Sequence, residues 1–411
     1  MRAMATPVNE SFRRTLCWSA MVCGCASTPT APKTPPPPVG SVSQPDAAAD
    51  TTGRAITSIK PVMTDELIAA AEPKLEAYLR RVLVGTAGAA GKRSIELVEA
   101  RPFAEGHVNE TWYLAIDVDG EIDHAALKIF PDLDAAGANA ANFKLAHDNG
   151  WPVPTELVRS TTAPYSDRPS LLMEFMVGGS LKVHVKGLFQ AAGDFAPDPA
   201  EIADLYAEVG DILGYLHKKH LRPRKASDAT AGGAMNAALE RCGQEGWCDD
   251  AAKKRFAALA EGLDDSPVTF CHGDLYESQI IMAEDGRVRA FIDLDTAGYC
   301  DPATDLGHLL AHVLMVNPAA RAKSWKVPAP TEEETSQTAR QVLLAYRASA
   351  EISEEEWPAL YKRVKAHAWL RMAMLMVRYK GNAHAKEMLE GLVAHRASFT
   401  SADPFAKLGP L

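Results

Sequence analysis

The sequence has no excess of basic residues. It contains 43 lysines and arginines against 53 aspartates and glutamates, which gives a formal net charge of −10 over 411 residues. Nucleic acids and anionic membranes attract proteins through clustered positive charge. We therefore expect neither as a partner, and the negative balance suits solubility or a cationic ligand.

Long apolar runs, internal repeats and metal-type cysteine pairs are also missing. No transmembrane span is expected, because the apolar stretch near the N-terminus is shorter than the roughly 20 residues that cross a bilayer. The seven cysteines are an odd number without paired spacing late in the chain, so reduced thiols in a cytoplasmic protein are the simplest interpretation. Hydrophobic residues make up 47% of the chain, enough for a large core in one large or two moderate domains.

Residues 1–60 differ in composition from the rest. Proline is dense from Thr28 to Gly40, and such density favours extended or disordered chain over packing. The segment Val22 to Cys25 follows two arginines and a short apolar stretch, and it resembles a bacterial lipoprotein cleavage site. We expect a cytoplasmic protein with a disordered N-terminal segment, and an exported lipoprotein is the alternative.

The stretch Val268 to Leu310 is expected to carry the chemistry. An apolar strand, Val268 to Cys271, is followed by His-Gly and then Asp274, where the glycine lets the backbone turn and fixes the carboxylate. Two later apolar runs flank an Asp-Gly turn in a hairpin pattern, and the second run ends in Asp293. Because a hairpin brings its strand ends together, Asp274, Gln279 and Asp293 should converge. Such a group suits a base beside Mg²⁺ ligands, and acids that only cap turns are the alternative.

This stretch resembles the catalytic loop and metal motif of the aminoglycoside phosphotransferase and choline kinase-like family, distant relatives of protein kinases. The family pattern HGDLxxxN holds a catalytic aspartate and a metal-binding asparagine. A later I-D and a D-P-x-x-D-L segment complete the pattern. The resemblance implies that Asp274 is the base, that Asp293 binds the metal, and that a supporting segment is formed by Asp301, Pro302 and Asp305. Gln279 departs from the usual asparagine.

Residues 94–129 alternate like strands, with Asp119-Gly120 as a hairpin turn. The loop between the first two strands resembles the segment of the family that covers the nucleotide. The matching residues are Gly106, Asn109, Thr111 and Trp112. A plain hairpin loop is the alternative interpretation.

Lys128 is the single charge in an apolar strand, Ala125 to Phe130. Because a buried unpaired ammonium is costly, it either reaches solvent from a sheet edge or meets an anion. The resemblance implies that Lys128 holds the α- and β-phosphates of ATP. The glutamate that fixes this lysine in the family corresponds to Asn139, which cannot form the ion pair, so Glu110 or Asp148 would have to substitute.

The run Leu171 to Gly179 predicts a buried strand that ends at a glycine break. It resembles the hinge of the family, where backbone groups near Glu174 to Met176 would read the adenine edge, and an ordinary core strand fits equally well. Helical periodicity covers 64–82, 135–149, 180–265 and 306–400. The acidic clusters at 332–334 and 354–356 are typical of solvated helix starts, and an acidic wall for a cationic acceptor is the alternative.

We therefore expect an α+β, two-lobed protein-kinase-like fold. A small antiparallel-sheet lobe with a leading helix, residues 61–177, would bind the nucleotide, and a larger, mainly helical lobe, residues 178–411, would carry the catalytic hairpin. The expected reaction is transfer of the γ-phosphoryl group of ATP, with Mg²⁺ held by Gln279 and Asp293, to a hydroxyl of an aminoglycoside, sugar or amino-alcohol acceptor. The alternatives are a weak or inactive nucleotide-binding module and an exported scaffold. The sequence does not indicate an oligomeric state.

Overall fold

The computed structural model describes residues 64–81, 94–103, 109–192, 197–228, 230–244, 250–321, 326–378 and 405–408. They belong to two compact units. Unit 1 contains the described residues up to Ala141 together with Pro154–Phe175. Unit 2 contains Asn142–Val153 and the described residues from Met176 onward. Residues 1–60 and Gly106, for which the sequence made predictions, lie outside the described residues.

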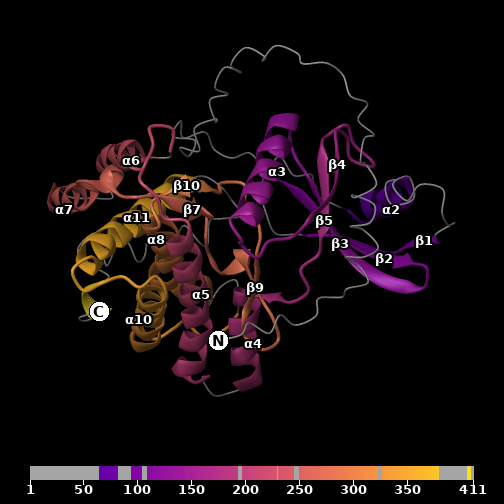
Figure 1. Ribbon diagram of the computed structural model, residues 1–411. Helices are drawn as coiled ribbons and strands as arrows, with labels where there is room; N and C mark the ends of the chain where they lie inside the picture. Colours follow the sequence, from indigo (N-terminus) through magenta and orange to yellow (C-terminus); the bar gives the residue numbers. More distant parts are fainter. Residues whose placement is uncertain are drawn as a thin grey trace, which may run out of the picture. The chain divides into compact units, whose positions relative to one another are not determined.

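Unit 1 is built on a five-stranded antiparallel sheet, drawn in violet to magenta in Figure 1. The strand order is β1-β2-β3-β5-β4, so β3 lies in the middle of the sheet. Its elements are α2 (Asp65–Leu79), β1 (Ile95–Pro102), β2 (Glu110–Val118), β3 (Glu121–Ile129), α3 (Leu133–Asp148), β4 (Glu156–Ser160) and β5 (Ser170–Glu174). The last turns of α3 belong to unit 2.

The β2-β3 hairpin forms as the sequence predicts. Asp119 and Gly120 adopt positive φ angles of 57° and 91°, which aspartate tolerates and glycine prefers in a two-residue turn. Alternate residues of β2, including Trp112 and Leu114, then enter one core with Leu127 of β3. The sheet pattern of the sequence is thereby confirmed.

Helix α2 packs against β1 and contributes to the same core. It begins after Thr64, whose Oγ1 accepts the backbone N–H of Leu67 at 3.3 Å. The sequence predicts this helix, with an apolar face formed by the residues that recur at helical spacing, Leu67, Ala70, Leu75, Leu79 and Val82. Val82 lies outside the described residues, and the face formed by the others is partly wrong. Leu67 and Ala70 are exposed, whereas Ala71 and Tyr78 join Leu75 and Leu79 in the core, since the face that meets β1 is rotated from the apolar stripe.

Unit 2 is mainly helical. Its elements are β6 (Gly179–Ser180), α4 (Leu181–Ala192), α5 (Pro199–Lys219), α6 (Gly232–Gln244), α7 (Asp250–Ala260), η2 (Leu263–Asp265), β7 (Thr269–Cys271), η3 (Glu277–Gln279), β8 (Ile280–Met282), β9 (Val288–Phe291), β10 (Gly298–Cys300), α8 (Ala303–Ala311), η4 (His312–Val316), α9 (Asn317–Ala320), α10 (Glu332–Ser349), α11 (Trp357–Arg378) and η7 (Ala406–Leu408). Helix α10 packs along α5, and α11 packs against α8 (Figure 1).

Two small sheets in unit 2 carry the predicted chemistry. Strands β8 and β9 form the expected hairpin, with Ile280 opposite Phe291, and β6 extends it. Strand β7 lies outside this hairpin and pairs with β10, so that Cys271 lies opposite Gly298. The helices expected over 180–265 and from 306 onward are present as far as residue 378, and 379–400 lie outside the described residues. None of the described helices has the length and apolar character needed to cross a bilayer.

Candidate active site

Asp274 follows β7 at a backbone turn that only glycine can make. Gly273 has a φ of 80°, and a Cβ built on it would lie 2.3 Å from the carbonyl oxygen of Thr296. A side chain at this position would collide with backbone, which cannot move aside cheaply. The close approach fixes the direction in which the next residue, Asp274, leaves the strand.

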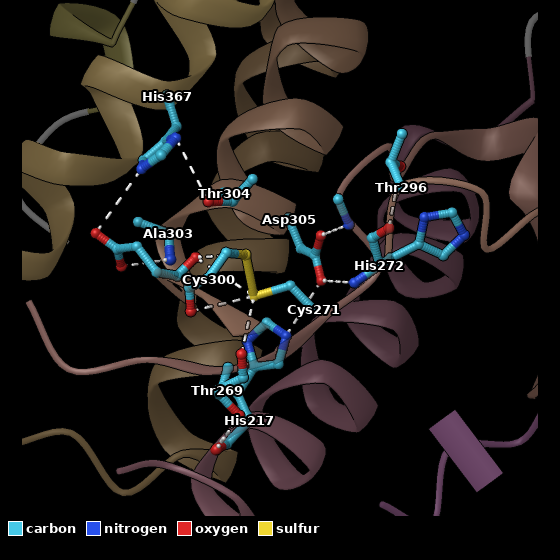
Figure 2. Close-up of a disulfide and its surroundings, with 12 residues drawn as sticks. His217, Thr269, Cys271, His272, Thr296, Cys300, Ala303, Thr304, Asp305 and His367 are labelled. Atoms are coloured by element: carbon cyan, nitrogen blue, oxygen red, sulfur yellow. Dashed lines mark hydrogen bonds and ion pairs between the residues drawn. A yellow bond between two sulfur atoms is a disulfide. The ribbon is translucent and has the colours of Figure 1, made fainter. Parts of the chain in front are cut away.

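Asp305 of α8 holds the backbone of the same loop. One carboxylate oxygen of this α8 residue accepts the N–H of His272 and the other accepts the N–H of Gly273, both at 2.8 Å (Figure 2). The Nε2 of His217 on α5 lies 3.3 Å from the same carboxylate, and the Nδ1 of His217 lies 3.1 Å from the hydroxyl of Tyr346. A buried carboxylate therefore fixes two consecutive backbone amides immediately before Asp274.

The charge of Asp305 is maintained despite its burial. Burial alone raises the pKa of this carboxyl, but the hydrogen bond and charge of His217 and the nearby His272 outweigh burial and hold the pKa below its usual value of 3.8. Tyr346 responds in the opposite direction, since burial and the adjacent Asp301 and Asp305 raise its pKa. Asp305 is therefore ionised and Tyr346 neutral at physiological pH.

His272 connects the loop to the end of β9. Its Nε2 lies 2.8 Å from the carbonyl oxygen of Ile292, and its Nδ1 lies 3.3 Å from the N–H of Asp274. Both contacts are satisfied when Nε2 carries the proton and Nδ1 accepts, so the network assigns this tautomer. The histidine thus fixes the position of Asp274 relative to the residue that precedes Asp293.

Gln279 and Asp293 meet at the end of the hairpin. The Nε2 of Gln279 donates to Oδ2 of Asp293 at 3.0 Å, and the backbone N–H of Ile292 donates to the carbonyl oxygen of Gln279 at 2.9 Å. Asp293 has a φ of 64°, a left-handed conformation that is uncommon outside glycine but that aspartate tolerates, as Asp119 also does. The predicted proximity of these two residues is confirmed.

Arg371 of α11 forms an ion pair with Asp274, a contact that the sequence analysis missed. The Nη2 of Arg371 contacts Oδ1 of Asp274, and the two side chains are 6% and 21% exposed. The candidate base is thus accessible, while its counterion is buried. Arginine 97 positions further along a helix leaves no local signal, so this partner could not have been found from spacing.

Asp301 anchors the start of α8. It accepts the N–H of Ala303 at 2.9 Å and the Nε of Arg363 at 2.8 Å, and His367 lies 3.8 Å away. Burial raises the pKa of Asp301, but His367 and Arg363 outweigh burial and lower it overall. Asp301 and Asp305 are therefore structural anchors of the loop, consistent with the supporting segment expected from the sequence.

Cys271 and Cys300 form a disulfide between the ends of β7 and β10 (Figure 2). The expectation of reduced thiols is wrong for this pair, because the two paired strands lie side by side and their cysteines have a Cα–Cα distance of 6.0 Å, although the two are not direct cross-strand partners. The sequence contained a signal that these two cysteines lie near each other. Cys271 immediately precedes the His-Gly-Asp motif and Cys300 immediately precedes Asp301, and both motifs were expected at the same site. The ligand atoms of His217, Cys271 and Asp305 lie within 4.8 Å of one another. They do not fit a metal site, because the sulfur is bonded and the carboxylate is bound to backbone amides.

Lys128 lies in the middle of the unit 1 sheet. Strand β3 is flanked by β2 and β5, and only 6% of Lys128 is exposed. Its ammonium lies 5.4 Å from the ring centroid of Phe130. The alternative of a lysine that reaches solvent from a sheet edge is therefore wrong.

Glu110 cannot substitute for the glutamate expected at position 139. Glu110 pairs with Ile129 and Thr111 pairs with Lys128, so Glu110 and Lys128 point to opposite faces of the sheet. The Glu110 carboxylate is already bound by Trp112, Tyr165 and Arg168. Asp148 is exposed and pairs with Lys144. Asn139 itself is buried on α3.

The remaining residues expected to bind the nucleotide lie on or next to β2, on β5 and at the boundary between the units. Asn109 is half-buried at the start of β2, and Trp112 is fully buried with its Nε1 donating to Glu110 at 2.8 Å, so Trp112 is a core residue. Glu174 ends β5 and accepts the hydroxyl of Thr155 at 3.0 Å, and its backbone N–H donates to Thr155. The division between the units falls after Phe175, immediately before Met176.

Comparisons with known proteins identify the family and the fold of this chain. A model of the phosphotransferase enzyme family matches residues 99–362, well over half of the chain. Among solved structures, an ethanolamine kinase from Plasmodium vivax superposes with a TM-score of 0.51 at 12% identity, covering 84% of this chain and 94% of that one. This similarity supports a kinase-like fold, with an antiparallel-sheet region and a mainly helical region, as expected from the sequence.

Two further structures are similar at lower scores. A thermostable mutant of an aminoglycoside phosphotransferase, in a ternary complex with ADP and hygromycin B, has a TM-score of 0.48 and 13% identity over 74% of this chain and 94% of that one. A choline kinase from Streptococcus pneumoniae has a TM-score of 0.45 and 14% identity over 81% of this chain and 100% of that one. No curated protein sequence matches the chain.

Proposed function

This chain belongs to the phosphotransferase enzyme family, and on that premise we propose that it transfers the γ-phosphoryl group of ATP to a hydroxyl group of a small molecule. It is a phosphotransferase with an alcohol group as acceptor. The observation that carries the proposal is the loop around Asp274. A partly exposed carboxylate is fixed by Gly273, His272 and Asp305, and His272 links it to the end of the hairpin where Gln279 meets Asp293.

Asp274 is the general base in this proposal. Its backbone N–H is held by His272, and its side chain is 21% exposed, so an acceptor hydroxyl can approach it. A base at this position orients the hydroxyl and takes its proton as the phosphorus–oxygen bond forms. Such a base typically contributes a factor of about 10² to 10⁴ in rate.

Asp293 and Gln279 would hold Mg²⁺. Carboxylate and amide oxygens are the hard ligands that Mg²⁺ prefers, and the two side chains already contact one another. A 180° rotation of the Gln279 amide would exchange its nitrogen for its oxygen on the Asp293 side. When bound, the ion neutralises developing charge on the phosphates.

Unit 1 supplies the nucleotide side in this proposal. Lys128 would pair with the phosphates, Gly106 and Asn109 would lie in the covering loop, and backbone groups of Glu174 and Met176 would contact adenine. Support comes from the position of Lys128, a cation on the central strand β3 of the sheet. The proposed lobes are residues 61–177 for the nucleotide and 178–411 for catalysis and the acceptor.

A catalytically weak or inactive nucleotide-binding module is the second candidate function. Asn139 favours it, because an amide replaces the carboxylate that would pair with Lys128, and Glu110 faces the other side of the sheet. The two candidates differ in one observable quantity. An inactive module binds ATP without forming a phosphorylated product, whereas the kinase forms ADP and product together.

The location proposed for a kinase is the cytoplasm, where ATP is abundant. The Cys271–Cys300 disulfide favours the alternative of an exported protein, since such bonds persist mainly in oxidising compartments. The redox state of this pair and the mature N-terminus, both measured by mass spectrometry on protein from its natural host, distinguish the two locations.

The function is tested by incubating the purified full chain with ATP, Mg²⁺ and a panel of alcohols. ADP release coupled to a mass increase of the acceptor is expected, with Asp274→Asn as the control that suppresses both. The acceptors expected from the sequence, aminoglycosides, sugars and amino alcohols, differ in charge, so the charged groups around Asp274 discriminate among them. ATP binding without any transfer across the panel would leave the inactive module as the better description.

A further inference from the structure

Arg371, His308 and His312 form a group of buried nitrogen-bearing side chains in unit 2, and Arg371 connects this group to Asp274. Arg371 of α11 is paired with Asp274 itself. His308 of α8 and His312 of η4 lie one helical turn apart, and the charge of Arg371 acts on both. All three side chains are buried, with 5%, 5% and 6% of their surface exposed. Asp274 is therefore paired with a buried guanidinium whose charge also acts on two buried imidazoles.

Each of these side chains has a buried nitrogen without a hydrogen-bond partner. Among the described residues these atoms include Nε of Arg371, Nδ1 of His308 and Nε2 of His312. Buried polar atoms are nearly always paired in native proteins, and an exception calls for a ligand or another explanation. Nε and Nη2 lie on the same edge of a guanidinium, so an oxygen bound by Nε of Arg371 would lie next to Asp274.

Arg371 is the positive charge of this group. Burial, and then the charge of Arg371, lowers the pKa of His312 well below 6.5, and burial is also the largest cause for His308. Both imidazoles are therefore neutral at pH 7. They can donate hydrogen bonds to a ligand or accept them from it, but they do not contribute to the preference of the site for an anionic or a cationic ligand.

Four buried carboxylates of unit 2 already have partners. Glu277 accepts from Tyr206 at 3.0 Å and from Asn317 at 2.6 Å, and its other oxygen lies 3.8 Å from His312. Asp301 and Asp305 hold Arg363, His217 and backbone amides. Glu334, from the acidic cluster at 332–334, is buried in an ion pair with Arg321. These four carboxylates are therefore engaged by groups other than an acceptor, and Asp274 itself is paired with Arg371.

We propose that the acceptor is a small alcohol that carries an anionic oxygen group, a carboxylate or a phosphate, and that Arg371 selects it. This inference rests on the proposed kinase function. The reacting hydroxyl must come within about 3 Å of Asp274, so the neighbouring substituents of the acceptor lie close to the guanidinium. A negative substituent is attracted by Arg371, whereas the ammonium of an amino alcohol or an aminoglycoside is repelled.

The test uses two matched series of acceptors that differ in charge. One shares a three-carbon backbone: glycerate, glycerol 3-phosphate, glycerol and 3-amino-1,2-propanediol. The other shares a six-carbon backbone: gluconate, glucose 6-phosphate, glucose and glucosamine. With the wild-type chain, ATP and Mg²⁺, we expect kcat/KM for an anionic member to exceed that of its neutral analogue at least tenfold and that of the cationic analogue by more. Comparing the carboxylate and phosphate members identifies the anionic group.

Variants of Arg371 separate charge selection from folding. Arg371→Gln should reduce the anionic-to-neutral ratio to below about threefold, mainly through KM, and Arg371→Lys should retain part of it. Lys362→Gln is the matched control, because it removes a positive charge from the same helix at a residue whose ammonium donates to the backbone carbonyl of Glu261 at 3.4 Å and not to Asp274. Melting temperatures verify that each variant is folded. If Arg371→Gln does not fold, the comparison of acceptors with the wild-type chain still tests the charge preference.

Three outcomes are decisive. A cationic member that is the best acceptor of its series overturns the inference, while ADP release and product leave the kinase function intact. The inference is also overturned if the protein binds ATP but phosphorylates none of the anionic members. If ATP is neither bound nor consumed with any acceptor, the proposed function itself fails.

Discussion

The two units of this protein place their buried charged groups by different means. In unit 1, Lys128 and Glu110 lie on adjacent strands, and the register of β2 and β3 puts them on opposite faces of the sheet. In unit 2, Asp305 and Arg371 reach the Asp274 loop from α8 and α11, two helices later in the chain. The first arrangement follows from strand alternation, whereas the second depends on contacts between distant elements.

Because of this difference, substitutions in unit 1 should affect ligand binding, whereas substitutions in unit 2 should affect the position of the Asp274 loop. A strand side chain keeps its face as long as the sheet is paired, so replacing Lys128 should change what the protein binds and little else. The Asp274 loop has only three residues of regular strand before it and is held by Asp305, His272 and Gly273. Changes in unit 2 should therefore alter catalysis and stability together, and five predictions test this contrast.

The largest effect is expected for Asp274→Asn. The amide keeps the shape of the side chain but cannot accept the proton of the hydroxyl, so kcat should fall by about 10² to 10⁴ with the affinity for ATP nearly unchanged. Steady-state kinetics and an ATP titration measure the two quantities. Lys128→Met is the counterpart in unit 1 and should raise the Kd for ATP. Near-normal turnover of Asp274→Asn would exclude Asp274 as the base.

Asp305→Ala is expected to destabilise the protein by about 3 to 5 kcal/mol. The change leaves the amides of His272 and Gly273 and the imidazole of His217 buried without their carboxylate partner. Denaturant unfolding gives the free energy directly, with exposed Asp211→Ala as the control. Lys128→Met in unit 1 should change this free energy less than Asp305→Ala, because a lysine side chain has no acceptor for backbone amides and its loss leaves none of them without a partner. Equal losses in both units would contradict the comparison.

Removal of the disulfide should cost about 3 to 4 kcal/mol. The bond closes a loop with a sequence separation of 29 residues, and the chain-entropy model for a loop of this length gives that magnitude. Thermal unfolding of wild type with and without a dithiol reductant should show the loss. The Cys271→Ser/Cys300→Ser double variant should melt lower and no longer respond to the reductant. An unchanged melting temperature on verified reduction would show that Asp305 alone holds the loop.

Gln279→Leu should reduce kcat at least tenfold, which corresponds to about 1.4 kcal/mol of transition-state stabilisation. Leucine has a similar length but lacks the amide that contacts Asp293. Gln279→Asn keeps an oxygen ligand on a side chain with fewer rotamers to order, so it should be tolerated or mildly beneficial. If the leucine variant matches wild type while Asp274→Asn is inactive, Gln279 only packs beneath the loop.

The smallest effect concerns pH. Burial, followed by the charge of Arg371, lowers the pKa of His308 well below its ordinary value of 6.5, so the unfolded chain binds the proton first as the pH falls. Stability from this group is therefore complete above pH 6.5 and decreases below it, by about 1 kcal/mol between pH 6.5 and 5.5. Denaturant unfolding at a series of pH values should show a shallower decline for His308→Gln. Parallel curves for the two proteins would exclude a buried neutral His308.

Local patterns in the sequence predicted the elements that depend on neighbouring residues. The alternation in β2 and β3, the Asp119-Gly120 turn and the β8-β9 hairpin all form as expected, because period-2 alternation and turn chemistry act over a few residues. The hairpin in turn brings Gln279 and Asp293 into contact, as the sequence predicted. The apolar face of α2 was partly wrong, since the contact with β1, rather than the helix pattern, decides which residues are buried.

The sequence by itself determined the β2-β3 and β8-β9 hairpins and the position of the His-Gly-Asp turn, but it predicted no strand for β4 or β10. Only the tertiary structure decided which groups support Asp274. Arg371, His217 and the Cys271–Cys300 bond come from segments that no periodic pattern links, and hydrogen bonds and ion pairs between distant residues depend on how helices pack. Tertiary packing also placed Lys128 in the middle of the sheet, because pairing on both sides of β3 comes from β2 and the later β5.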